Sequence, residues 1–224
     1  MLDKSLFICY STTNYAKLTN LCLDSLNCIN VKNINHKIDN PSPDLLKNTG
    51  FQTEIWYYSV RNKIKHLIDV LEQYDSLSNI KYFIFSDCDI IYIKKNINEW
   101  YNLEKVILDN DKDIFFMQEG CSYRVNTGFF VIKNNKNIRN IINFFIEVLQ
   151  IFDKTCNSTI PYGDQSIINN IKHKLNYGVI PNEYVVFGIY IFNKNKSLLH
   201  HAVCCNNIDE KILQINKIKE NFKC

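Results

Sequence analysis

Residues 82–95, YFIFSDCDIIYIKK, decide the fold, because they place two carboxylates, Asp87 and Asp89, inside one of the most apolar runs of the chain. The apolar residues 82–86 predict a buried strand. An ionised carboxylate taken out of water loses much of its solvation free energy unless a cation or strong donors replace the solvent. The pair follows the carboxyl end of the predicted strand, where open α/β sheets bind ligands. The stretch therefore predicts an α/β fold with a positive partner beside these side chains.

The spacing of the two aspartates suggests what that partner is. In extended backbone, residues i and i+2 point to the same face, so Asp87 and Asp89 can share one ion directly or through a water. Hard cations such as Mg²⁺ and Mn²⁺ bind through one or two carboxylates plus the oxygens of a substrate phosphate. The alternative is a solvated turn between two strands, since D-x-D alone is a weak motif. Cys88 is expected to point to the opposite face as a small core residue.

Short apolar runs on both sides of this stretch alternate with longer segments of helical period, which is typical of an α/β fold with a largely parallel sheet. Strands are expected at residues 5–10, 81–86, 90–93, 113–117, 127–133, 177–180, 184–187 and 197–201. Helices are expected at residues 15–27, 53–74, 97–108, 136–152, 164–174 and 208–221. Residues 32–51 and 153–163 are expected to be long loops within a single domain of residues 1–224.

Composition excludes several classes of protein. The chain has 224 residues, of which 46% are hydrophobic and 22% charged, as in ordinary globular domains. A net charge of +3 without a basic run argues against nucleic-acid binding. Nine cysteines, an odd number without C-x-x-C spacing, argue against a disulfide framework and a zinc knuckle, so reduced thiols are expected. Neither a signal peptide nor an apolar span of membrane length is found, so a cytoplasmic location is expected.

Five further motifs accompany the D-x-D pair, namely FICYSTTNYAKLT, YYSVRNKIKHL, VNTGFFVIKN, PYGDQSIIN and SLLHHAVCC. Each has an ordinary structural interpretation. Thr13 or Asn14 could cap a helix, Arg61 could lie on an exposed basic face, a glycine could mark a tight turn, and Asp164 could be an N-cap.

In their order along the chain, these motifs resemble those of GT-A fold glycosyltransferases that use nucleotide sugars, such as the glycogenin and bacterial lipopolysaccharide galactosyltransferase group. The resemblance covers most of the chain. It implies a GT-A (Rossmann-like) domain with a mixed, mainly parallel central sheet flanked by helices. It also implies a metal-dependent transfer of a sugar from a nucleotide-diphosphate sugar, a UDP-sugar, to a hydroxyl acceptor, with retention of the anomeric configuration.

The resemblance assigns nucleotide contacts to the polar turn after the first strand. It implies that this turn lines the base and ribose and supplies a hydrogen bond and a stacking face, through Tyr10, Ser11, Thr12, Asn14 and Tyr15. On the helix before the D-x-D strand, Lys63, and less surely Arg61, would face the phosphates or the donor sugar.

The N-T-G and D-Q motifs would surround the transferred sugar. By the resemblance, Asn126 and the backbone near Thr127 and Gly128 lie against this sugar, while Asp164 and Gln165 lie close to the anomeric carbon. Gln165 is a poor nucleophile and no carboxylate is obviously placed for that role. Attack on the same face of the sugar as the departing group is therefore the expected form of retention.

The paired histidines would complete the metal site, because the family places a metal-ligand histidine at this point. Alignment of the motif favours His200, and a shift by one residue selects His201; on a strand only one of them can face the metal. An imidazole beside two carboxylates suits Mn²⁺ somewhat better than Mg²⁺. The sequence departs from the family at Val203, where glycine is usual, and lacks the Lys-Pro-Trp that follows, so Lys211 is the candidate phosphate-binding lysine.

Two other functions compete with this interpretation. Phosphatases of the haloacid dehalogenase type also place D-x-D after an apolar strand and bind Mg²⁺, but normally on their first strand. A protein that binds sugar nucleotides without turnover is the second alternative. The acceptor could be a glycan, a protein or a small molecule, and neither it, the donor sugar nor the oligomeric state can be predicted from these motifs.

Overall fold

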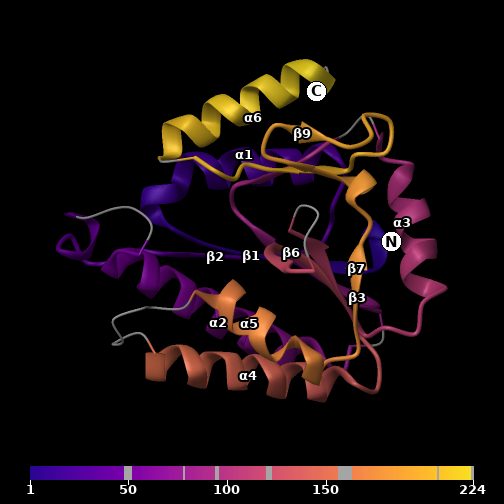
Figure 1. The fold of residues 1–224 in the computed structure, drawn as a ribbon, viewed down its shortest axis with the longest axis horizontal. Coiled ribbons are helices and arrows are strands. Elements are labelled where there is room, and N and C mark those ends of the chain that lie inside the picture. Colours follow the sequence, from indigo (N-terminus) through magenta and orange to yellow (C-terminus); the bar gives the residue numbers. More distant parts are fainter. Residues whose placement is uncertain are drawn as a thin grey trace.

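A central sheet runs through the structure, a computed structural model that describes residues 1–47, 52–77, 79–93, 96–119, 123–155, 163–205 and 207–222. Its six described strands lie in the order β2-β1-β3-β6-β5-β7 (Figure 1). The strands are β1 (Ser5–Thr12), β2 (Ile34–Asp39), β3 (Tyr82–Asp87), β5 (Ile114–Gln118), β6 (Val125–Lys133) and β7 (Tyr177–Ile180).

Strand direction in this sheet places one set of strand ends together. Neighbouring strands are parallel except for β6, which runs antiparallel to both β3 and β5. The carboxyl ends of β1, β3 and β5 and the amino end of β6 therefore lie on the same side of the sheet, at one end of its strands. This sheet confirms the mixed, mainly parallel architecture that the sequence predicts.

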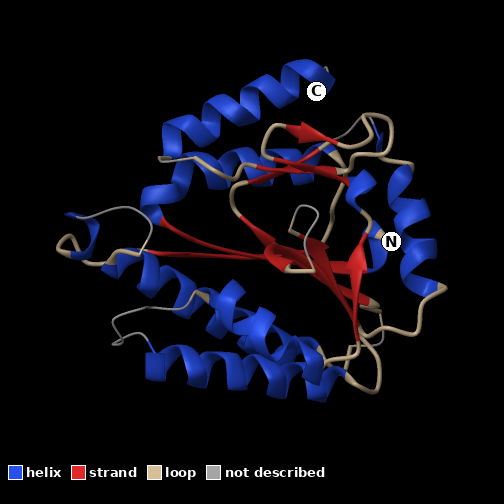
Figure 2. Cartoon of the chain, viewed as in Figure 1, coloured by secondary structure: helices blue, strands red, loops and turns tan. Residues whose placement is uncertain are grey.

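Helices cover both faces of the sheet (Figure 2). Alternate side chains of β1 enter two different cores, Leu6 and Ile8 on one face and Phe7 and Cys9 on the other. The first face packs against α2 (Glu54–Tyr74), α4 (Ile138–Thr155) and α5 (Asp164–Ile171). The second packs against α1 (Ala16–Cys28) and α3 (Glu99–Leu108), and α6 (Ile208–Phe222) lies outside α1.

A second, smaller sheet joins the D-x-D turn to the histidine motif. It has the order β4-β10-β8-β9, formed by β4 (Ile90–Tyr92), β10 (Leu199–His201), β8 (Val185–Phe187) and β9 (Tyr190–Ile191). Because β10 pairs antiparallel to β4, His201 lies opposite Ile90, the residue that follows Asp89. Short 3₁₀-helices occur at Leu2–Lys4, Thr13–Tyr15, Leu45–Lys47, Lys172–Lys174 and Asn182–Tyr184.

The predicted elements are found with small shifts of their ends, with three corrections. Residues 32–51 contain strand β2 where a long loop was expected, and β9 was not predicted. β2, with the sequence INHKID, is a half-covered edge strand, so burial imposes no apolar alternation on it. The helix expected to reach residue 174 ends at Ile171 and continues as a 3₁₀ turn.

Two other expectations concern loops and thiols. Of the loop expected at residues 153–163, the first three belong to α4, and residues 156–162 lie outside the described ones. The described cysteines carry free thiols, while Cys121, Cys156 and Cys224 lie outside the described residues. None of the helices that the structure describes has the length and apolar character needed to cross a membrane.

Candidate active site

Contrary to what its spacing suggested, the D-x-D pair is not extended throughout, because Asp87 ends a strand while Asp89 lies on a turn. β3 ends at Asp87, and Cys88 and Asp89 form the turn before β4. Asp89 is nevertheless buried, at 9% exposed, whereas Asp87 and Cys88 are partly exposed. Cys88 lines a cavity beside both aspartates, so its expected place in the core is wrong.

The side chain of His201 lies beside the two aspartates. Ligand atoms of Asp87, Asp89 and His201 all lie within 4.8 Å of one another, and His201 Nε2 is 3.3 Å from Asp89 Oδ1. Nε2 of His200 points elsewhere, 3.0 Å from the Gly188 carbonyl oxygen and 3.2 Å from Gln214 Oε1. Of the two candidate histidines, His201 rather than the favoured His200 therefore lies beside the aspartates. The signal that selects His201 is its register against β4, which local sequence does not contain.

The cluster fits a divalent cation. Within the described part of the chain, Asp89 Oδ1 is buried and accepts no hydrogen bond of normal geometry, although His201 Nε2 lies 3.3 Å away. Two carboxylates and one imidazole form a donor set that suits Mn²⁺ or Mg²⁺. An orphaned buried carboxylate oxygen is costly in a protein interior, and a cation between the three side chains would satisfy it.

Gly128 makes room for this histidine. A Cβ atom at position 128 would overlap His201 Cε1 and lie 3.0 Å from its Nε2. The ladder between β5 and β6 is irregular here, with Phe116 opposite Phe130 but Met117 opposite Asn126. Side chains therefore satisfy the local backbone: Gly128 N–H donates to Asn126 Oδ1 and Thr127 N–H to Gln165 Oε1.

Two lysines neutralise the carboxylates. Lys63 Nζ on α2 lies 2.7 Å from Asp164 Oδ2 and 3.3 Å from Asp87 Oδ1, and Lys211 Nζ on α6 contacts Asp89 Oδ2. Burial opposes the charge of Lys63 and Lys211, but their acidic partners outweigh it and raise the pKa of both lysines. Three carboxylates thus face two ammonium groups, and a divalent cation would add the positive charge that a polyanionic ligand needs.

The two aspartates respond differently to this environment. Burial raises the pKa of Asp87 to about 6, although Lys63 opposes the change. Burial also acts to raise the pKa of Asp89, but Lys211 and His201 outweigh it and hold this pKa well below its usual range. Asp89 is thus the firmly ionised member of the pair.

Asp164 and Gln165 begin helix α5. The N-cap is Gly163, so the N-cap interpretation of Asp164 is wrong. Its Oδ2 atom instead accepts a 3.1 Å hydrogen bond from Thr127 Oγ1 in addition to the Lys63 contact. Gln165 donates to Glu119 Oε1 at 2.8 Å.

Asn169, one turn further along α5, was not predicted to have a role. Its side chain accepts from Val125 N–H at 2.9 Å and donates to the Val125 carbonyl at 2.8 Å. It thereby fixes the amino end of β6. An asparagine inside a helix gives no local signal of such a contact.

A cavity of about 220 Å³ lies on one side of the aspartates. It brings together most of the residues predicted to bind the nucleotide, namely Tyr10, Ser11, Thr12, Tyr15, Lys63, Asp87 and Lys211. Asn14 is not among the described residues that line it; its Oδ1 accepts from Thr12 Oγ1. The sequence did not single out the wall contributed by α2, which consists of Ile55, Trp56, Ser59 and Val60.

Strand β2 supports the polar turn beside this cavity. Tyr10 O–H donates to Asp39 Oδ2 at 2.7 Å, and burial and then this carboxylate raise the pKa of Tyr10. Ser11 Oγ lies 3.2 Å from His36 Nε2. Helix α1 has Tyr15 as its N-cap, without a side-chain cap bond among the described residues, so the capping interpretation of this turn is wrong.

A second cavity, of about 350 Å³, lies on the other side. Its lining includes Asn126, Thr127, Gly128, Asp164, Gln165 and His201. Both cavities are lined by Trp56, Val60, Lys63 and Asp87, so they adjoin along these side chains, and we call the pair the cleft. Arg61 lies elsewhere, in a two-bond ion pair with Asp153 on α4, as its structural interpretation predicted.

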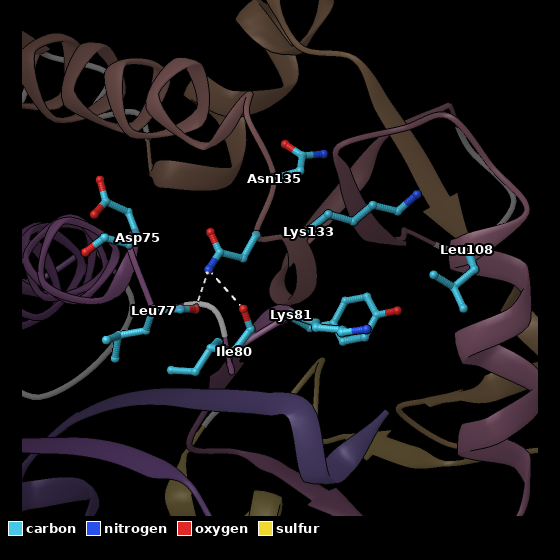
Figure 3. A pocket seen from close by; sticks show the side chains of 10 residues that line it. Asp75, Leu77, Ile80, Lys81, Leu108, Lys133 and Asn135 are labelled. Carbon is cyan, nitrogen blue, oxygen red and sulfur yellow. Dashed lines mark hydrogen bonds between the residues drawn. The ribbon is translucent and has the colours of Figure 1, made fainter.

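Another cavity, of about 450 Å³, is shown in Figure 3. It lies at the opposite ends of the sheet strands. It lies where β3 begins and β6 ends, between Tyr82 and Lys133. The Asn134 side chain donates to the carbonyl groups of Leu77 and Ile80 there. None of the predicted site residues lines it.

Comparison with known proteins agrees with this geometry. A family model described as nucleotide-diphospho-sugar transferase matches residues 24–215. A glycosyltransferase involved in the glycosylation of the major capsid of PBCV-1 is similar in structure, with a TM-score of 0.61 and 15% identity over 94% of this chain and 99% of that one. Glycosyltransferase GlyE of Streptococcus pneumoniae TIGR4 gives a TM-score of 0.55 and 15% identity over 89% of this chain, which spans 55% of GlyE. At such identities the likeness concerns the fold, and it confirms the expected GT-A architecture. No curated protein sequence gave a significant match.

Proposed function

Because the chain belongs to the nucleotide-diphospho-sugar transferase family, we propose that it transfers a sugar from a UDP-sugar to a hydroxyl acceptor, with Mn²⁺ or Mg²⁺ and with retention. One observation carries the proposal: Asp87, Asp89 and His201 cluster where two cavities adjoin. The polar turn of Tyr10 lies on one side of this cluster, and Asp164 and Gln165 lie on the other. A nucleotide diphosphate joined to a sugar needs three such adjoining regions.

The proposed metal ligands are Asp87, Asp89 and His201. When bound there, the cation would neutralise the diphosphate and act as a Lewis acid for the departing UDP. Lys211 is positioned beside Asp89 to offer its ammonium group to a phosphate oxygen. We take Mn²⁺ as the better match because one ligand is an imidazole.

The reaction breaks the bond between the anomeric carbon and the diphosphate oxygen and forms a bond to the acceptor oxygen. The acceptor proton passes to an oxygen of the departing diphosphate, so atoms and charge balance. Asp164 lines the proposed sugar site beside Gln165, but Lys63 and Thr127 already engage its carboxylate, which lowers its nucleophilicity. These contacts favour attack on the same face of the sugar over a covalent sugar–enzyme intermediate.

Lys63 has a positioning role in this scheme. It lies between Asp87, a proposed metal ligand, and Asp164, beside the proposed sugar site. One side chain thus fixes the separation of two regions that must act on the same substrate.

The test is a thermal-shift screen of the common UDP-sugars with Mn²⁺, followed by assays of UDP release. We expect one or more donors to stabilise the wild type in the presence of Mn²⁺ and to be turned over. Asp87→Ala should lose the metal-dependent part of the stabilisation. If the variant bound UDP and Mn²⁺ like the wild type, the assignment of the cluster would be wrong.

The same screen separates the alternatives. Stabilisation by UDP and Mn²⁺ without turnover of any donor would support the protein that binds without catalysis. Hydrolysis of simple phosphate esters, unaffected by sugar nucleotides, would support the phosphatase, although here the D-x-D pair follows β3 rather than the first strand. A single domain over residues 1–224 and a cytoplasmic location remain proposals from the sequence.

A further inference from the structure

Helix α2 presents a row of side chains to the cleft, and Trp56 is its most prominent member. Trp56, Val60 and Lys63 recur at helical spacing and line both cavities. Lys63 reaches the carboxylates, so Trp56, two turns earlier, lies farther along the cleft. Gln52 is exposed and lies just before the helix. It lines the second cavity, of about 350 Å³, which we call the outer cavity.

Tyr57 and Gly163 are among the neighbours of the Trp56 indole. The Tyr57 ring is nearly perpendicular to it, with ring centroids 5.0 Å apart. A Cβ atom at Gly163 would come within 2.8 Å of the indole Cη2 atom. Gly163 has φ −73° and ψ 166°, a conformation open to any residue, so its backbone does not require glycine. What the missing side chain provides is space for the indole.

The chemistry of the outer cavity matches a carbohydrate. Its described lining is mostly amide, hydroxyl, carboxylate and cationic groups, with Gln52, Arg124 and Ser166 beyond the residues of the central cluster. Among the described residues of this lining, Trp56 and Val60 are the only large apolar side chains. A lipid tail needs an apolar wall, which two such side chains do not make. A sugar ring has hydroxyl groups at its edge and a C–H face that packs on an aromatic plane, so it matches both features.

We propose that the part of the outer cavity around Gln52 and Trp56, beyond the donor-sugar site proposed beside Asp164, is the acceptor subsite, that the acceptor is a carbohydrate, and that Trp56 determines its specificity by stacking on a sugar ring. This inference rests on the proposed glycosyl transfer and adds the class of acceptor to it. The hydroxyl group of the bound saccharide attacks the anomeric carbon of the donor, and its proton leaves with UDP. Free mono- and disaccharides are therefore acceptors or competitive ligands for this site.

The first experiment separates acceptor binding from donor binding. With a UDP-sugar that the wild type turns over, the KM of a panel of mono- and disaccharide acceptors is measured for the wild type, Trp56→Ala, Trp56→Phe and the control Tyr101→Ala. Tyr101 is an exposed aromatic residue on α3, outside both cavities. We expect Trp56→Ala to raise the acceptor KM by about tenfold and the donor KM much less, Trp56→Phe to restore much of the loss, and Tyr101→Ala to behave like the wild type.

A second readout does not depend on turnover. The chain has two tryptophans, and the other, Trp100, is 2% exposed and packed in the core against Phe7. Titration of the wild type with an acceptor saccharide should therefore change tryptophan fluorescence through Trp56. The change should be absent in Trp56→Phe, whose remaining indole is buried.

Three results would overturn the inference. An acceptor KM for Trp56→Ala within about twofold of the wild type would remove the stacking role, since an aromatic contact is worth more than that. An equal rise in the donor KM would assign the indole to the donor sugar. Transfer to tyrosine- or serine-containing peptides but to no saccharide would contradict the acceptor class. In each case UDP-sugar turnover by the wild type persists, whereas a wild type that neither binds nor turns over any UDP-sugar defeats the proposed function itself.

Discussion

Gly128 and His201 approach so closely that any side chain at position 128 would overlap the imidazole. The glycine lies on the central sheet and the histidine on the second sheet, so the contact spans the junction between them. Glycine at this position is thus a requirement of packing, not of a turn. The contact packs the glycine of the N-T-G motif directly against the histidine of the proposed metal site.

Gly128→Ala should therefore remove the response to Mn²⁺. A methyl group must displace His201 from the two aspartates, at a cost of about 1–3 kcal/mol for overpacking. We expect a lower melting temperature and no further stabilisation by Mn²⁺, measured by thermal shift. Gly178→Ala is the matched control, because its Cβ would also crowd a ring, that of Phe115, but far from the cluster. A Gly128→Ala protein that kept the wild-type Mn²⁺ shift would contradict the role of this contact.

The two adjacent histidines should behave differently on substitution. His201→Ala removes a proposed ligand, so the Kd for Mn²⁺, measured calorimetrically in the presence of UDP, should rise about tenfold or more. His200→Gln keeps a donor toward the Gly188 carbonyl and should leave the Kd for Mn²⁺ within a few-fold. The reverse pattern would restore His200 as the ligand.

Lys211 should oppose binding of the metal alone and favour binding of the metal with UDP. Its ammonium group contacts Asp89 in the free protein, so a cation must compete with it. In Lys211→Met we expect tighter binding of Mn²⁺ without nucleotide and a smaller gain in affinity when UDP is added. Titration calorimetry measures the Kd for Mn²⁺ without UDP and the Kd for Mn²⁺ with UDP, and so gives both the affinity and its gain. Weaker binding of Mn²⁺ alone by the variant would sink this prediction.

Lys63 should contribute more to stability than its neighbour Arg61. Lys63→Ala leaves Asp87 and Asp164 facing each other in a largely buried site, which should lower the free energy of unfolding by about 3 kcal/mol. Arg61→Ala on the same helix breaks an exposed pair with Asp153, worth about 0.5–1 kcal/mol. Urea unfolding of both variants gives the comparison, and equal losses would mean that the Lys63 bridge is not effectively buried.

His66 should make the protein less stable in mild acid. Burial, followed by the charge of Lys37, lowers the pKa of this imidazole, whereas Asp69 opposes the shift and His36 adds to it. The unfolded chain therefore binds a proton at a higher pH than the folded one. Stability is fully present above the unfolded pKa of about 6.5 and falls as the pH drops below it.

Urea unfolding of the metal-free protein at pH 7.5 and about 5 measures this effect. His66→Gln should show a smaller loss between the two pH values than the wild type. His173→Gln, at an exposed position, should show the wild-type loss. Parallel curves for His66→Gln and the wild type would contradict the prediction.

Local sequence predicted the elements that burial constrains. β1 is buried at every position and β3 at all but its last, and their apolar runs located both strands. β2 escaped prediction because an edge strand with polar residues carries no such constraint, yet its Asp39 fixes Tyr10 in the cavity proposed for the nucleotide. Part of the candidate site was therefore missed together with the strand that supports it.

Contacts between distant elements explain the other differences in the site. The motifs placed Asp164 and Lys63 in the site, but not their 2.7 Å ion pair across two helices. The choice between His200 and His201 depends on strand register, and the role of Trp56 depends on a gap at Gly163. Such pairings become visible only when the chain is folded.

The register of His201 against Ile90 has a consequence for the order in which the protein gains its structure. Asp87 ends a strand of the central sheet, while His201 arrives much later in the chain and belongs to the second sheet. A cation bound by both residues would therefore connect β3 and β10, two strands that are far apart in the sequence. Amide hydrogens of β10 should then exchange more slowly when the ion is bound, while those in the middle of β1 keep their rate.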